Sequence, residues 1–221
     1  MKTEIYLIRH GQSIANKEER YLGQTDLDLS DVGYKQAEAA ASGLSHLKID
    51  VIYSSSLMRA HNTAYPHARL RGLDVIDRDD LREIYLGEWE NVPLSYLRTL
   101  DSFNYGWTEN FGSFKVPGGE SVPEAAERFY NAVADIAKRE EGRVVLIAAH
   151  AAVIRAFWGK ISGIPEGEVA SRVKFPLNTS LSKVEYDGDK LTPIFYSDVS
   201  HLPKSLNPTM EIDKTDKNDS K

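Results

Sequence analysis

Short apolar runs alternate along this chain with longer stretches of helical spacing, and this alternation limits the folds that the chain can adopt. The strand-like runs are residues 5–8, 51–53 and 144–149. Continuous apolar runs of this kind are typical of central strands in a parallel sheet covered on both faces. The helical stretches are residues 37–44, 126–136 and 152–161, and the expected N-cap of the first is Ser30. Strands that alternate with helices predict an α/β fold with parallel crossovers.

Three further segments of the chain do not follow this alternation of buried strands and helices. Residues 181–186 alternate apolar and polar side chains, Asp187-Gly188 supplies a turn, and residues 191–196 return, which predicts a hairpin at the sheet edge. Residues 91–117 are aromatic-rich and irregular, so we expect a lid or insertion there. The chain is polar from residue 204 onward, which predicts a single domain over residues 1–203 followed by a flexible tail over 204–221.

Composition excludes several classes of protein. The chain has 221 residues and a formal net charge of -6, which argues against a nucleic-acid partner. It has no cysteine, so it has neither disulfides nor thiolate chemistry. No apolar run is long enough to span a bilayer, and the N-terminus lacks the apolar core of a signal peptide. We therefore expect a cytoplasmic protein with no membrane partner.

Reactive side chains follow each predicted strand. Arg9 and His10 come directly after residues 5–8, Arg59 lies just beyond residues 51–53, and His150 follows residues 144–149. Any one of these alone would more often be structural. Because the carboxyl ends of parallel strands meet at one edge of a sheet, we expect the four side chains to form a site for a phosphate-like dianion.

With these motifs in place, the sequence resembles the histidine phosphatase superfamily, also called phosphoglycerate mutase-like. The resemblance covers roughly residues 1–200. The segments that carry it are LIRHGQSIAN at 7–16, GQTDLDLSDVGYKQA at 23–37, IYSSSLMRAHNTA at 52–64, LREIYLGEWE at 81–90, PGGES at 117–121, LIAAHAAVIR at 146–155 and PLNTS at 176–180. It implies a three-layer sandwich with a mostly parallel central sheet flanked by helices.

The resemblance also implies a role for each matching residue. His10 would be the nucleophile that becomes a phosphohistidine, and Glu83 would be the proton donor. The phosphoryl-binding residues that it implies are Arg9, Arg59, His150 and Asn16. Gln24 and Thr25 stand where members of the family contact substrate.

Elementary electrostatics supports these roles. Arg9 and Arg59 disfavour the imidazolium form of His10, so its ring should be neutral near pH 7, as a nucleophile requires. The same cations would stabilise charge on the transferring phosphoryl group. A phosphate dianion nearby would raise the pKa of Glu83 and make it a usable acid. Because arginines supply the positive charge and the histidines lack the spacing of a zinc site, we expect neither a metal nor a cofactor.

Four residues depart from the family pattern. Ala149 replaces the usual Ser, Ala151 and Ala152 replace two Gly, and Asn91 replaces the Gly of the usual Trp-Glu-Gly. The backbone N–H of Ala151 remains, so we still expect a phosphate contact there, although a positive φ at this position would strain an alanine. We expect these changes to alter rate and pocket shape rather than chemistry.

Three functions remain open at this stage. The first is a phosphomonoester hydrolase that acts on a small phosphorylated metabolite. The second is a phosphoglycerate-type mutase with the same nucleophile, and the third is a weakly active regulatory protein that binds a phosphorylated ligand. The segment after Glu83 shows no match to the longer segment of true mutases, which favours the phosphatase. Neither the individual substrate nor the oligomeric state can be derived from the sequence.

Overall fold

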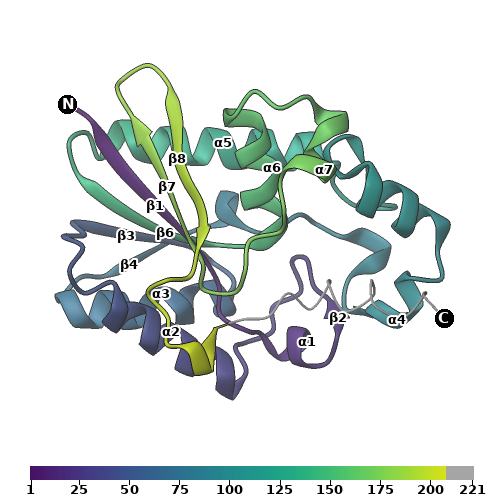
Figure 1. Cartoon of the computed structure of the whole chain (residues 1–221), viewed down its shortest axis with the longest axis horizontal. Helices are drawn as coiled ribbons and strands as arrows, with labels where there is room; N and C mark the ends of the chain where they lie inside the picture. Colours follow the sequence, from purple (N-terminus) through teal and green to yellow (C-terminus); the bar gives the residue numbers. More distant parts are fainter. Residues whose placement is uncertain (208–221) are drawn as a thin grey trace.

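A six-stranded sheet forms the centre of the molecule (Figure 1), and the computed structural model describes residues 1–207. The strands lie in the order β4–β3–β6–β1–β7–β8. Their bounds are β1 (Thr3–Arg9), β3 (Val51–Ser55), β4 (Val75–Arg78), β6 (Val144–Ala149), β7 (Leu181–Tyr186) and β8 (Leu191–Asp198). Neighbours among β4, β3, β6 and β1 run parallel, whereas the hairpin of β7 and β8 adds two antiparallel strands at one edge. The predicted sheet and its edge hairpin are both confirmed.

Helices cover both faces of this sheet (Figure 1). The main helices are α2 (Asp31–Gly43), α3 (Met58–Arg71), α5 (Val122–Arg139) and α6 (Ala151–Ile161). Along β1, Ile5 and Leu7 pack into the core that includes α5 and α6, while Tyr6 and Ile8 pack into the core that includes α2 and α3. Because successive strand residues point to opposite faces, β1 is apolar throughout. The predicted three-layer sandwich is confirmed.

Two of these main helices begin at side-chain caps. Ser30 accepts a hydrogen bond from the Gly33 N–H at 3.1 Å, as expected for the N-cap of α2. Ser121 and Glu124 form a reciprocal capping box at the start of α5. These local signals fix where each helix starts, and hence where the preceding loop meets the edge of the sheet.

Short elements surround the carboxyl ends of the strands. Their bounds are α1 (Ile14–Lys17), β2 (Arg20–Tyr21), η1 (Asp79–Leu81), η2 (Gly87–Trp89), β5 (Val92–Pro93), α4 (Leu94–Leu97), η3 (Ser102–Glu109), η4 (Phe111–Ser113), η5 (Glu166–Glu168) and α7 (Val169–Arg172). β2 pairs antiparallel with β5, which ties the segment after β1 to residues 91–117. The segment η3 is π-helical, a form enriched at functional sites.

The aromatic residues of 91–117 divide into two groups. Phe103, Trp107 and Phe111 are buried and pack edge-to-face with neighbouring rings, whereas Tyr96 and Tyr105 are exposed. The segment therefore has an aromatic core of its own that continues into the main core. Aromatic pairs of this kind add about 0.5–1.5 kcal/mol each beyond the area they bury.

The first residues of the predicted tail lie against α2. Lys204–Leu206 form a 3₁₀ turn, η6, and the Leu206 carbonyl oxygen accepts a hydrogen bond from Gln36 Nε2 at 3.3 Å. Residues 208–221 of that predicted tail lie outside the described residues. Within residues 1–207, no helix combines the length and the apolar character needed to cross a bilayer.

Candidate active site

The ends of three adjacent parallel strands bring the predicted residues together. Arg9 ends β1 beside Ala149 of β6, so His10 and His150 leave neighbouring strands at the same level. Their ring centroids are 5.2 Å apart. A cavity of about 660 Å³ opens beside them, and its walls include Arg9, His10, Asn16, Arg59, Glu83 and Ala151. A pocket therefore lies at the edge of the sheet where the sequence predicted a site.

His10 is held in one tautomer. Its Nδ1 lies 2.7 Å from the carbonyl oxygen of Gly11, and because a carbonyl oxygen can only accept, Nδ1 must carry the proton. Nε2 then keeps its lone pair. Burial lowers the pKa of His10 well below its usual value, and the charges of Arg59 and Arg9 lower it further. The ring is thus neutral near pH 7 with a nucleophilic nitrogen available.

Arg59 is almost fully buried, at 1% exposure, and is fixed by a backbone loop. Its guanidinium donates to the carbonyl oxygens of Thr25 at 3.1 Å and Gly23 at 2.6 Å. Burial lowers its pKa to about 10, so it stays charged at neutral pH. This permanent cation faces the cavity beside His10.

The loop that holds Arg59 is itself organised by Glu90. The Glu90 carboxylate accepts hydrogen bonds from the backbone N–H of Gln24 at 2.7 Å and of Thr25 at 3.0 Å, and from the Thr25 hydroxyl at 2.8 Å. Burial raises the pKa of Glu90, but these donors outweigh burial and hold it below its usual value. Glu90 therefore acts through the loop to position Arg59.

Glu83 is buried at the start of α6. Its two oxygens accept hydrogen bonds from the N–H groups of Ala152 and Val153, each at 3.0 Å, and of Ile84 at 2.9 Å. Burial raises the pKa of Glu83, while the amide donors and Arg59 oppose that rise. The net direction is upward, which favours the protonated carboxyl more than in an exposed glutamate.

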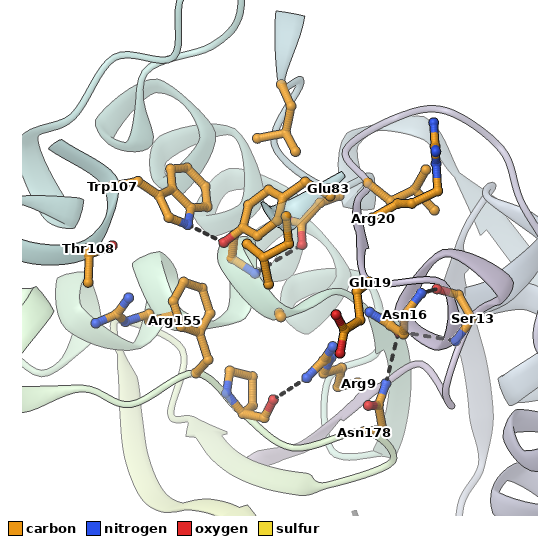
Figure 2. Close-up of a pocket in the computed structure, with 18 of the residues that line it drawn as sticks. Arg9, Ser13, Asn16, Glu19, Arg20, Glu83, Trp107, Thr108, Arg155 and Asn178 are labelled. Atoms are coloured by element: carbon orange, nitrogen blue, oxygen red, sulfur yellow. Dashed lines mark hydrogen bonds between the residues drawn. The ribbon is translucent and has the colours of Figure 1, made fainter. Parts of the chain in front are cut away.

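A second group of hydrogen bonds orients the other wall (Figure 2). Asn178 donates from Nδ2 to the His10 carbonyl oxygen at 3.0 Å and to Asn16 Oδ1 at 3.5 Å. Asn16 Oδ1 also accepts from the Ser13 N–H at 3.1 Å in the capping box of α1, so its amide group has a fixed orientation. Arg9 donates from Nη1 to the Pro176 carbonyl oxygen at 2.7 Å.

Three predicted residues lie behind the wall rather than on it. Gln24 and Thr25 are not among the residues that line the cavity, since Gln24 donates to the Glu83 carbonyl oxygen at 3.0 Å and Thr25 is bound to Glu90. A direct substrate contact by either one stays a prediction. His150 is fully buried, with Nε2 2.8 Å from the Ser55 hydroxyl and no hydrogen-bond partner for Nδ1 within residues 1–207.

Sequence reasoning missed the far wall of the cavity. Figure 2 shows Arg155 and Trp107 there, opposite Asn16 and Asn178. The Trp107 indole N–H donates to the Tyr21 hydroxyl, and Tyr21 packs edge-to-face on Trp107 at 5.8 Å between ring centroids. The aromatic content of 91–117 was visible in the sequence. Nothing local showed that Tyr21, from the β2–β5 pair, would meet it.

Comparison with known proteins assigns the chain to a family. Residues 5–198 match the model of the histidine phosphatase superfamily (branch 1). The chain belongs to this superfamily. Among curated relatives, phosphoglycerate mutase-like protein 4 of Arabidopsis thaliana is 33% identical over 91% of this chain and 88% of its own length. The metal-independent phosphoserine phosphatase of the same plant is 35% identical over 90% of this chain and 83% of its own. Among solved structures, Bacillus stearothermophilus YhfR covers 91% of this chain and all of its own, at 29% identity and a TM-score of 0.84.

The departures of this histidine phosphatase from the family pattern have physical explanations. Ala151 begins the regular helix α6 and is not among the residues with positive φ, so the alanine is unstrained. Asn91 does have a positive φ of 56°, a conformation that asparagine tolerates better than most residues. Its side-chain oxygen also accepts a hydrogen bond from Arg20 Nε at 2.7 Å. Asparagine therefore replaces a glycine here and adds an anchor for β2.

Proposed function

We propose that this protein hydrolyses phosphomonoesters of small metabolites through a phosphohistidine formed on His10. The observation that carries the proposal is the His10–Gly11 hydrogen bond, which leaves the Nε2 lone pair on a buried, neutral ring beside Arg59. Phosphoryl transfer to histidine needs a neutral imidazole next to a permanent cation. The imidazole supplies the attacking lone pair, and the cation stabilises the negative charge on the phosphoryl oxygens.

In the first step, His10 Nε2 forms a bond to phosphorus while the bond from phosphorus to the ester oxygen breaks. The protonated Glu83 carboxyl gives its proton to that oxygen, and the alcohol leaves. Arg9 and Arg59 bind the phosphoryl oxygens. His150 Nδ1, which has no hydrogen-bond partner within residues 1–207, would be a further donor for them. The first backbone N–H of α6, at Ala151, is another candidate donor because Ala151 lines the cavity.

In the second step, water attacks phosphorus and the phosphohistidine bond breaks. The Glu83 carboxylate, now deprotonated, accepts the proton of that water, which restores the acid and the free imidazole. One ester bond is broken, one water is consumed, and alcohol and inorganic phosphate are released. Every charge in this scheme is supplied by side chains of the chain itself.

Support for a small substrate comes from the cavity and from the relatives. A volume of about 660 Å³ suits a metabolite, and a phosphoserine phosphatase of 35% identity aligns over most of the chain. Residues 91–117 would act as the lid, since η3 contributes Phe103, Asn104, Trp107 and Thr108 to the wall. We further propose a cytoplasmic location and no nucleic-acid partner, in keeping with the net charge of -6.

A mutase would share the first step and differ in what meets the phosphohistidine next. The test is to supply 3-phosphoglycerate with a trace of 2,3-bisphosphoglycerate and follow both 2-phosphoglycerate and free phosphate. Phosphate release without isomerisation supports the phosphatase, and isomerisation faster than phosphate release contradicts it. Failure to turn over any monoester, including an aryl phosphate, would leave only a phospho-ligand-binding role.

A further inference from the structure

The walls of the cavity are strongly cationic although the chain as a whole is acidic. The basic residues that line it are Arg9, Arg20, Arg59, Arg98, Arg155 and Lys174. The acidic ones are Glu19 and Glu83. One phosphoryl group at His10 uses the cations at that end of the cavity, so the positive charge on the far wall needs a separate explanation.

Arg155 is the most constrained of these distant cations. Its side chain is 4% exposed, with Nε donating to the Val173 carbonyl oxygen at 2.6 Å and Nη2 donating to the Ala170 carbonyl oxygen at 2.8 Å. The guanidinium carbon lies 4.4 Å from the centroid of Phe111 and 4.2 Å from that of Phe175. The group is therefore held rigidly between two rings.

No carboxylate of residues 1–207 forms an ion pair with Arg155, and its Nη1 makes no hydrogen bond with those residues. Burial lowers its pKa to about 10, so the group remains charged at neutral pH. Within residues 1–207 the partners of this buried cation are carbonyl oxygens and ring faces, so its charge is incompletely compensated, and an anion entering the cavity would complete its environment.

The two cationic ends belong to one continuous space (Figure 2). Tyr21 lines this same space, and its hydroxyl accepts the hydrogen bond of the Trp107 indole N–H on the far wall. Lys174 follows Val173 on the same wall and is exposed to the cavity. A ligand with one phosphoryl group at His10 can therefore reach the far wall with a second charged group.

We propose that Arg155 binds a second anionic group of the substrate, so that the preferred substrates are phosphomonoesters that also carry a carboxylate or another anion. This inference rests on the proposed phosphatase function and names its substrate class. The planar guanidinium, fixed by Phe111 and Phe175, offers Nη1 to an oxygen of the incoming anion. Arg155 is a binding residue in this scheme and takes no part in proton or phosphoryl transfer.

The test uses two pairs of substrates that differ in one carboxylate. Phosphoserine is compared with phosphoethanolamine, and 3-phosphoglycerate is compared with glycerol 3-phosphate. The unaltered enzyme should prefer the carboxylate-bearing member of each pair in kcat/KM by about 10- to 100-fold, as expected for one charge-assisted hydrogen bond in a buried site. Arg155→Gln should remove most of that preference, chiefly through KM, and Arg155→Lys should restore part of it.

Arg172→Gln is the matched control, because Arg172 lies on neighbouring α7, outside the cavity, in an exposed ion pair with Glu168. It should leave the preference intact. If both variants lose kcat/KM equally on the two members of each pair, Arg155 only holds α7 in place, and the proposal is overturned. If neither variant folds, the unaltered enzyme still decides, since no preference within either pair would contradict the proposal. Turnover of an aryl phosphate, and its loss in His10→Ala, test the phosphatase function separately.

Discussion

Glu83 Oε2 accepts a hydrogen bond from the Ala152 N–H at 3.0 Å, which docks the candidate acid onto the first turn of α6. The preceding residue of that helix is Ala151, on the cavity wall, and His150 is its N-cap. One helix start therefore positions the candidate acid and the proposed phosphate-binding amide of Ala151 together, so a small displacement of α6 would disturb both.

Glu83→Gln keeps the shape of the side chain and removes its proton-donating ability. Turnover of alkyl phosphates should fall by roughly 10²–10⁴-fold, whereas aryl phosphates, whose leaving oxygen hardly needs a proton, should lose much less. Steady-state kinetics on one substrate of each type measures the difference. Losses of the same size on both types would mean that Glu83 only positions α6.

The pH profile provides an independent check on the same residue. Because burial raises the pKa of Glu83, the basic limb of kcat/KM should lie above the usual range of a carboxyl group. The limb should be absent in Glu83→Gln. A basic limb that is unchanged in this variant would assign that titration to another group.

Glu90→Gln tests the loop that holds Arg59. An amide group replaces one acceptor oxygen, so one of the backbone N–H groups of residues 23–25 faces another donor, at a cost of about 1–3 kcal/mol. We expect kcat/KM to fall by roughly 10- to 100-fold. Glu88→Gln is the control, since Glu88 is exposed two residues away. Equal values of kcat/KM in the two variants would show that Glu90 does not position Arg59 for the reaction.

Much of this arrangement could be predicted from sequence, because apolar runs and the residues after them report strand ends directly. Arg9, His10, Arg59 and His150 lie at this edge of the sheet as expected, and Glu83, which the family resemblance added, lines the same cavity. The edge strand β4 was not predicted, since Ile76 and Asp77 are exposed and the segment has no buried run. Arg155 was also missed, because its position on a helix is ordinary and only packing against α7 and residues 173–176 brings it to the cavity.

Gln24 and Thr25 show a different limit of sequence reasoning. Their place in a matching motif was clear, and a direct contact with substrate stays a prediction, but the structure also connects Gln24 to Glu83 and Thr25 to Glu90. A matching motif contains residues that hold a neighbouring side chain in place as well as residues that contact the substrate. Only the direction of each side chain separates a support from a ligand contact, and that direction depends on long-range packing.

Stability should depend on pH through His67, a fully buried residue of α3 with no hydrogen-bond partner for either ring nitrogen within residues 1–207. Burial lowers its pKa to about 3. In the unfolded chain the His67 ring takes up a proton near pH 6.5, whereas in the folded protein it stays neutral. The stability that neutral His67 contributes is therefore present above pH 6.5 and is lost as the pH falls below it. At pH 5 the free energy of unfolding should be about 2 kcal/mol lower than at pH 7.5 from this residue alone.

Urea unfolding of the native chain and of His67→Met at a series of pH values measures this effect. Between pH 6.5 and 5, the free energy of unfolding of the variant should depend less steeply on pH, by a slope that corresponds to at most one proton. His10 and His150 have depressed pKa values too and keep part of the dependence. An unchanged slope in His67→Met would show that His67 takes up protons in the folded state.

Activity should survive prolonged treatment with EDTA, because Arg9 and Arg59 supply the positive charge at the phosphoryl site. No group of three or more His, Cys, Asp or Glu side chains within residues 1–207 is placed to hold a metal ion. Vanadate should inhibit as a trigonal-bipyramidal mimic of the transferring phosphoryl group. Loss of activity on chelation that a divalent ion restores would contradict this prediction.

The central claim is that His10 carries the phosphoryl group between the two steps. Rapid quench of the enzyme with a ³²P-labelled monoester should trap a phosphoenzyme that is labile to acid and stable to alkali, as a phosphohistidine is. Peptide mapping should place the label on His10, and His10→Ala should show neither label nor turnover. Turnover without a labelled intermediate, or a label on any other residue, would contradict the account.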